Sequence, residues 1–117
     1  MPETLPRGSR LRRRREFLAV QGEGKKLHTP SFLVFVRPRA DALAAPARLG
    51  ITVSRKVGGA VARNRIKRVV REVFRRHRSF FPQGIDLVFV AKRAVPVLGY
   101  EQATAEVEKL CERFFQR

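Results

Sequence analysis

The most regular spacing of apolar and polar positions lies between residues 52 and 77. At about 100° per residue, the apolar side chains from residue 60 onward fall on one side of a helix. They are Ala62, Ile66, Val69, Val70, Val73 and Phe74. The opposite side carries a polar stripe made of Asn64, Arg68, Arg71 and Arg75, with Arg63 and Lys67 at its boundary. This pattern predicts an amphipathic helix whose outer face is cationic.

Runs of β-branched and aromatic residues predict strands at residues 31–37, 48–54 and 85–91. The third run is almost continuously apolar, so we expect it at the centre of the sheet. Residues 38–46 have the composition of a loop that joins a hairpin. Gly50 interrupts the second strand and indicates a bulge or a close approach of another group.

Helical spacing predicts a first helix at residues 10–20, with Leu11 and Leu18 on one face, and a last helix at residues 100–115. Two glycines predict a loop at residues 21–26. The surface of the last helix is expected to carry four of the ten acids of the chain: Glu101, Glu106, Glu108 and Glu112.

These elements predict an α+β fold. Three helices pack on a small mixed sheet of about four strands in a two-layer sandwich, in the order α-β-β-α-β-α. The length of 117 residues suits one domain. We therefore expect a flexible basic arm at residues 1–9 and a single α+β domain at residues 10–117.

The charge of the chain indicates what kind of partner the protein binds. Its 26 basic and 10 acidic residues give a net charge of +16, and between residues 55 and 78 the single acid is Glu72. A solvated helix face usually mixes signs, because like charges four residues apart repel. The charge therefore predicts binding to a polyanion. No apolar run is long enough for a membrane span, and Trp is absent, so we expect a cytoplasmic nucleic-acid binder without membrane contact.

Side chains that would carry catalysis are few. His28 and His77 are the two histidines, and Cys111 is the single cysteine, which helical spacing places among core residues. Asp86 lies in an apolar strand with no second acid near it in sequence. These residues supply neither a nucleophile with a base nor a set of metal ligands. The sequence predicts a binding protein.

Residues 60–75, AVARNRIKRVVREVFR, preceded by GITVSRKVG at residues 50–58, closely resemble the protein component of bacterial ribonuclease P. The similarity continues in REFLAVQGEGKK upstream and in GIDLVFVAKRA downstream. The resemblance implies a protein that binds a catalytic RNA subunit and precursor tRNA. The RNA, with Mg²⁺, would hydrolyse the bond that releases the 5′ leader. No further protein partner is expected, and whether the protein itself holds a metal ion stays open at this point.

The resemblance also implies which residues bind RNA. Contacts with the RNA subunit are expected from Arg55, Lys56, Arg63, Asn64, Arg65, Lys67, Arg68 and Arg71. A cleft between the first helix and the sheet would hold the single-stranded leader, through Phe17, Leu33, Phe35, Thr52 and Lys56. Gln21 departs from the family, which commonly has an aromatic side chain there. The family fold further implies a left-handed βαβ crossover.

Three other classes of protein are compatible with this charge and length. A structural RNA-binding protein of the ribosomal type would bind folded RNA and show no preference for a 5′ leader. A stand-alone nuclease is disfavoured by the missing side-chain chemistry. A DNA-binding module remains open, although no helix-turn-helix pattern is evident.

Overall fold

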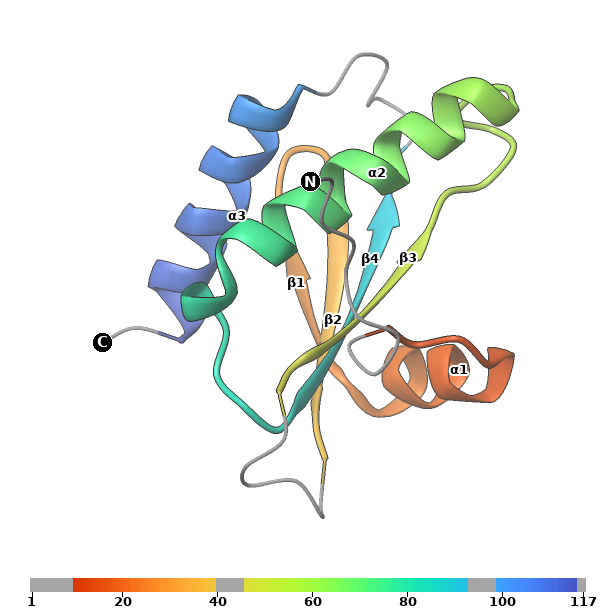
Figure 1. The fold of residues 1–117 in the computed structure, drawn as a ribbon. Coiled ribbons are helices and arrows are strands. Elements are labelled where there is room, and N and C mark those ends of the chain that lie inside the picture. The colour runs from red at the N-terminus through yellow and green to blue at the C-terminus, as the bar shows by residue number, and fades with distance from the viewer. Residues whose placement is uncertain (1–9, 40–45, 93–98, 116–117) are drawn as a thin grey trace.

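The computed structural model describes residues 10–39, 46–92 and 99–115 (Figure 1). Its elements, in chain order, are α1 (Arg14–Glu23), β1 (Lys25–His28), β2 (Phe32–Pro38), β3 (Arg48–Thr52), α2 (Ala60–Arg76), the short 3-10 helix η2 (Arg78–Phe80), β4 (Ile85–Ala91) and α3 (Tyr100–Phe114). The predicted α+β class, with three helices and a four-stranded mixed sheet, is confirmed. The predicted flexible arm at residues 1–9 lies outside the described residues.

The strands are ordered β1-β2-β4-β3. β4 pairs antiparallel with β2 and parallel with β3, so its predicted central place is confirmed. The expected hairpin across residues 38–46 is wrong, because β4 lies between β2 and β3. The hairpin instead joins β1 to β2, and β1 was predicted as part of a loop. Leu27 is the one buried residue of β1, since this edge strand otherwise exposes charged side chains.

The connection from β3 through α2 to β4 is a left-handed crossover. In Figure 1, α2 lies in front of the sheet, and the chain returns to β4 on the left of β3, with the two strands parallel. Most βαβ connections are right-handed. The handedness implied by the family resemblance is therefore present.

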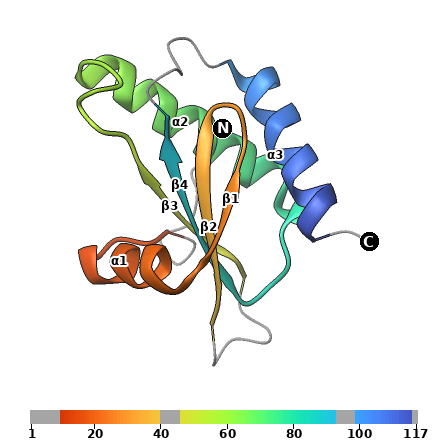
Figure 2. The same ribbon diagram turned by 180° about the vertical axis from the view of Figure 1, so that it is seen from behind.

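The two faces of the sheet carry separate apolar clusters. One cluster joins the sheet to α2 and α3 and includes Phe32, Leu87 and Phe89. The other lies under α1 and contains Leu11, Val20, Phe35 and Val88, with Phe17, Leu33 and Val90 packed against it. Figure 2 shows α1 on the side of the sheet opposite α2 and α3. This arrangement explains why both faces of β2 are apolar.

The first helix, predicted at residues 10–20, begins four residues later and ends three residues later, so residues 21–23 are helical and the loop predicted at residues 21–26 is wrong. Arg10 and Leu11 form an extended segment beside β3, where the amide of Leu11 donates to the carbonyl of Leu49 at 2.9 Å. Leu11 is 5% exposed, whereas Leu18 is 52% exposed, so the two leucines do not share a face. α1 begins after the amides of Arg12 and Arg13 donate to the carboxylate of Glu16, both at 3.0 Å.

The helix predicted from residue 60 is confirmed in position and orientation. Ile66, Val70, Val73 and Phe74 are buried, with Val69 at the margin of the core. In α3, Glu101, Glu108 and Glu112 are exposed as expected. Glu106 is an exception, since it is 9% exposed, and Cys111 is fully buried as predicted. Burial raises the pKa of the Cys111 thiol to about 12.

A buried ion-pair network holds α1 against the sheet. Asp86 of β4 is 2% exposed and accepts hydrogen bonds at 2.9 Å from Arg39, which follows β2, and from Arg48 of β3. Arg48 also reaches Glu16 of α1 at 3.4 Å. Burial opposes ionisation of Asp86, but the two guanidinium groups outweigh it and the pKa of Asp86 lies below its ordinary value of 3.8. The network therefore connects three strand ends and one helix.

Replacing Asp86 should be costly because two guanidinium groups would lose their carboxylate. We expect Asp86→Asn to lower the free energy of unfolding by about 3 kcal/mol at pH 7, measured by urea denaturation. The matched control is Glu23→Gln, which removes the exposed pair with Arg37 and should cost less than about 1 kcal/mol. Because folding lowers the pKa of Asp86, its contribution is present above pH 3.8 and is lost as the pH falls through the folded value. Equal losses for both variants would contradict this role.

Candidate nucleic-acid interface

A groove of about 430 Å³ lies between α1, the end of β3 and α2. Its lining residues come from four segments: Arg12 and Arg14 at the start of α1, Phe17, Leu18 and Gln21 further along it, Ile51, Thr52 and Val53 at the end of β3, and Lys67 of α2. Apolar side chains form part of its surface, and cations stand on opposite sides. Leu18 is half exposed here and adds apolar surface to the groove beside Phe17.

Gly50 determines how closely Phe17 approaches β3. A Cβ atom at this position would lie 2.6 Å from Cε2 and 2.8 Å from Cζ of the Phe17 ring. The ring therefore packs directly on the backbone of β3, and the close approach predicted for Gly50 is confirmed. Because the network around Asp86 holds α1 and β3 together, the groove is bounded by elements whose spacing is fixed.

The structure brings together part of the predicted leader site. Phe17 and Thr52 line the groove. Leu33 and Phe35 are not among its lining residues. Both lie in the cluster under α1, where Phe35 is 9% exposed with the Lys26 ammonium 5.9 Å from its ring centroid. Lys56 is exposed in the turn after β3 and is not among the lining residues.

Several lining residues were not predicted. The sequence predicts Arg12 and Arg14 within a helix that begins at residue 10, and Leu18 on the same face of that helix as Leu11. Gln21, singled out as a departure from the family, lines the groove. Lys67, expected at the RNA subunit, also faces the groove from α2. The run of arginines before Phe17 was the signal available for the first two residues.

The predicted cationic surface falls on exposed and half-exposed positions. Asn64, Arg65 and Arg68 are exposed on α2, and Arg55 and Lys56 are exposed in the turn that precedes it. Arg63, Lys67 and Arg71 are half-buried along the margin of the helix. Arg75 differs from the expected stripe, because it donates to Glu72, with Nε at 3.0 Å from Oε1.

His77 has structural partners. Its ring stacks on Phe80 with centroids 4.7 Å apart, and its Nε2 lies 3.0 Å from the Tyr100 hydroxyl. Among the described residues, no cluster of three or more His, Cys, Asp or Glu side chains could hold a metal ion. Within the same residues, no helix is long and apolar enough to cross a membrane.

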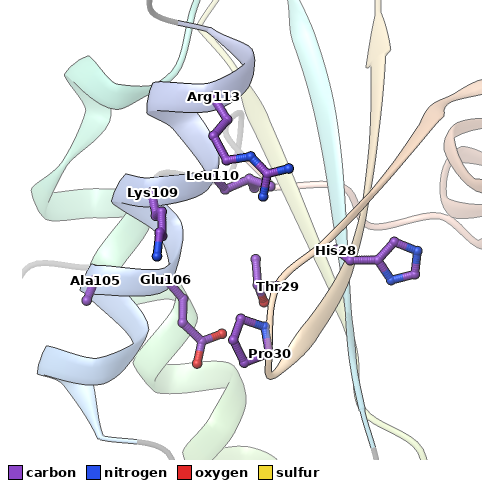
Figure 3. A pocket seen from close by; sticks show the side chains of 8 residues that line it. All are labelled: His28, Thr29, Pro30, Ala105, Glu106, Lys109, Leu110 and Arg113. Carbon is purple, nitrogen blue, oxygen red and sulfur yellow. The ribbon is translucent and has the colours of Figure 1, made fainter.

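A second cavity, of about 240 Å³, lies between the β1–β2 turn and α3 (Figure 3). Its acid, Glu106, points toward the turn and accepts hydrogen bonds from the Ser31 amide at 3.0 Å and the Ser31 hydroxyl at 2.7 Å. Gln102 donates to the same carboxylate at 3.2 Å. Glu106 therefore joins α3 to the hairpin. The strand order puts this hairpin at the edge of the sheet opposite the groove.

Comparison with known proteins agrees with this geometry. A profile of the family described as Ribonuclease P matches residues 5–114. The chain belongs to the ribonuclease P protein family. It is 49% identical to the ribonuclease P protein component of Desulfovibrio desulfuricans over 111 residues, which cover 93% of this chain and 85% of that protein.

Solved structures of ribonuclease P proteins have the same fold. The Thermotoga maritima protein superimposes with a TM-score of 0.79 at 36% identity, covering 90% of this chain and 96% of that chain. The Staphylococcus aureus protein gives a TM-score of 0.79 at 28% identity, covering 90% and 94%.

The contact between Phe17 and Gly50 can be tested by crowding it. Gly50→Ala should lower the free energy of unfolding by about 1–3 kcal/mol, because the new methyl group would overlap the ring. Adding Phe17→Leu should recover most of that loss in the double variant, measured by urea denaturation. Additive losses would show that the two side chains do not meet.

Proposed function

We propose that this ribonuclease P protein binds the catalytic RNA subunit through the outer face of α2 and the turn before it, and binds the 5′ leader of precursor tRNA in the groove beside α1. In this assembly it promotes Mg²⁺-dependent removal of the leader. The hydrolysis and the metal ions are assigned to the RNA subunit. The protein contributes charge neutralisation and positioning.

The observation that supports this proposal most is the arrangement of the groove. Phe17 and Leu18 provide apolar surface, while Arg12, Arg14 and Lys67 stand around it. Proteins that bind single strands combine aromatic surfaces for bases with cations that follow the backbone. Folded RNA, by contrast, is recognised mainly by its shape and by contacts along its grooves.

The two surfaces are adjacent, which gives the proposal its mechanism. Lys67 lines the groove, and Arg68 is exposed on the outer face of the same helix. An RNA packed on α2 and a strand in the groove would therefore lie on either side of one helix. The helix would neutralise phosphates of both, which otherwise repel each other.

The decisive assay is cleavage of precursor tRNA by a bacterial ribonuclease P RNA at low Mg²⁺, with and without this protein. We expect the protein to restore cleavage, and to bind precursor tRNA more tightly than mature tRNA in the assembled complex. Tight RNA binding without a gain in cleavage would instead favour a structural RNA-binding protein. Cleavage by the protein alone would place the chemistry on its own side chains.

Arg68 tests the α2 surface. Arg68→Glu should weaken binding to the RNA subunit roughly tenfold near 0.1 M salt and lower the salt slope by about 1, because one fewer counterion is released. Arg113→Glu is the matched control, since Arg113 is exposed on α3 and should change neither quantity. An unchanged affinity and slope for Arg68→Glu would remove this face from the RNA interface.

A further inference from the structure

The cavity between the β1–β2 turn and α3 lies apart from both proposed RNA surfaces. Its walls are supplied by the turn, with the end of β1, and by one side of α3 (Figure 3). None of its lining residues belongs to α2 or to the groove beside α1. A molecule bound in this cavity would therefore leave both RNA surfaces free.

The two walls are fastened to each other. Glu106 of α3 accepts hydrogen bonds from the amide of Ser31 at 3.0 Å and from its hydroxyl at 2.7 Å. The turn is also tied to the end of β4, because the ammonium of Lys92 donates to the carbonyl of Thr29 at 2.7 Å. A cavity whose walls are already in place binds a partner without the cost of ordering them.

The interior of the cavity is aliphatic. Leu110, which is 2% exposed, and the exposed Pro30 and Ala105 supply its apolar surface. Among the described residues that line it there is neither Phe nor Tyr, whereas proteins that bind single-stranded RNA stack its bases on aromatic rings. Pockets for whole small molecules begin at about 300 Å³, and this cavity has about 240 Å³. Its size and chemistry suit one apolar side chain of a partner.

The mouth of the cavity is cationic. Lys109 and Arg113 are exposed and lie one helical turn apart on α3, and His28 lines the side formed by β1. Lys25 adds a further positive charge, because its ammonium lies 5.3 Å from the centroid of the Phe114 ring. The guanidinium of Arg113 lies 5.4 Å from the same centroid. Positive charges from two elements therefore meet beside the opening.

The acids near the mouth leave these charges uncompensated. In the part of the chain that the structure describes, neither Lys109 nor Arg113 forms an ion pair. Glu106 lines the cavity, but its carboxylate accepts hydrogen bonds from Ser31 and Gln102. The exposed acids of α3 are not lining residues. Anionic groups on a partner would thus complement the charge around the opening.

We propose that this cavity binds an acidic segment of a partner protein. One apolar side chain of that segment enters the cavity, and the carboxylates beside it pair with Lys109 and Arg113. The apolar contact selects the segment, and the cations attract it and fix its register. This inference goes beyond the proposed function, since it concerns a protein partner and uses neither RNA surface.

The first experiment compares two peptides that differ in one side chain. The probe is acetyl-Asp-Asp-Leu-Asp-Asp amide, and its matched control has Ser in place of Leu. Backbone amide chemical shifts of the full chain are followed during titration at about 0.1 M salt. The Leu peptide should bind roughly tenfold more tightly, because it buries apolar surface that Ser lacks, and its shifts should centre on Thr29 and Ala105. Equal affinities would overturn the proposal, because attraction to a chain of net charge +16 acts on both peptides alike.

Variants separate the cavity from the charge around it. Ala105→Leu puts a larger side chain at the cavity from an exposed helical position and should abolish the preference for the Leu peptide. Ala60→Leu, the same change at an exposed position of α2, should keep that preference. Lys109→Gln combined with Arg113→Gln should weaken both peptides roughly fivefold and leave the ratio between them unchanged. Equal effects of the two Ala→Leu changes would contradict the proposal.

A last arm asks whether RNA occupies the cavity instead. An oligouridylate should leave the amides of Thr29 and Ala105 unshifted and should not displace the Leu peptide, although it binds elsewhere on the chain. Shifts of these amides that Ala105→Leu removes would reassign the cavity to RNA and overturn the proposal. No arm uses the catalytic RNA or precursor tRNA, so a failure here is distinguishable from a failure of the proposed function.

Discussion

The position of α1 depends on one buried carboxylate. Asp86 holds Arg48, and Arg48 holds Glu16, which in turn caps the first turn of α1. A charge buried in this way is tolerated because each of its partners is itself charged and hydrogen-bonded. The network acts at a distance from the groove, yet it fixes the spacing between α1 and β3. The groove beside α1 is thus built on a polar core contact as well as on apolar packing.

Much of the fold could be predicted because, in its main elements, the local preference of the residues and their packing in the fold favour the same structure. The cationic helix was predicted to the residue at its start, since its apolar spacing leaves one orientation toward a core. β1 was missed because a four-residue edge strand with one buried side chain carries almost no pattern. The first helix was placed too early, at residues 10–20 in place of 14–23, because arginines favour a helix locally, whereas pairing with β3 holds Arg10 and Leu11 extended.

The candidate site was predicted less completely than the fold. Residues of one helix can be assigned to a face from spacing alone. The expectation that Asn64, Arg65 and Arg68 are exposed is therefore correct. The groove is made of side chains from separate segments, and spacing does not show how deeply each one lies. Phe35 alternates correctly with its neighbours, but α1 covers it. Arg12 and Arg14 reach the groove only because the helix begins later than its sequence suggests.

The path of the chain between Arg10 and His28 has a consequence for the order of folding. These residues begin beside β3 at one edge of the sheet, cross a face as α1 and end as β1 at the other edge. This segment cannot pack in place until β3, β4 and β2 are paired. The pairing of β3 with β4 in turn requires that the crossover through α2 has formed. Contacts between distant parts of a chain form slowly. We expect this segment to pack last, so that a nascent chain completes its core before the groove beside α1 exists.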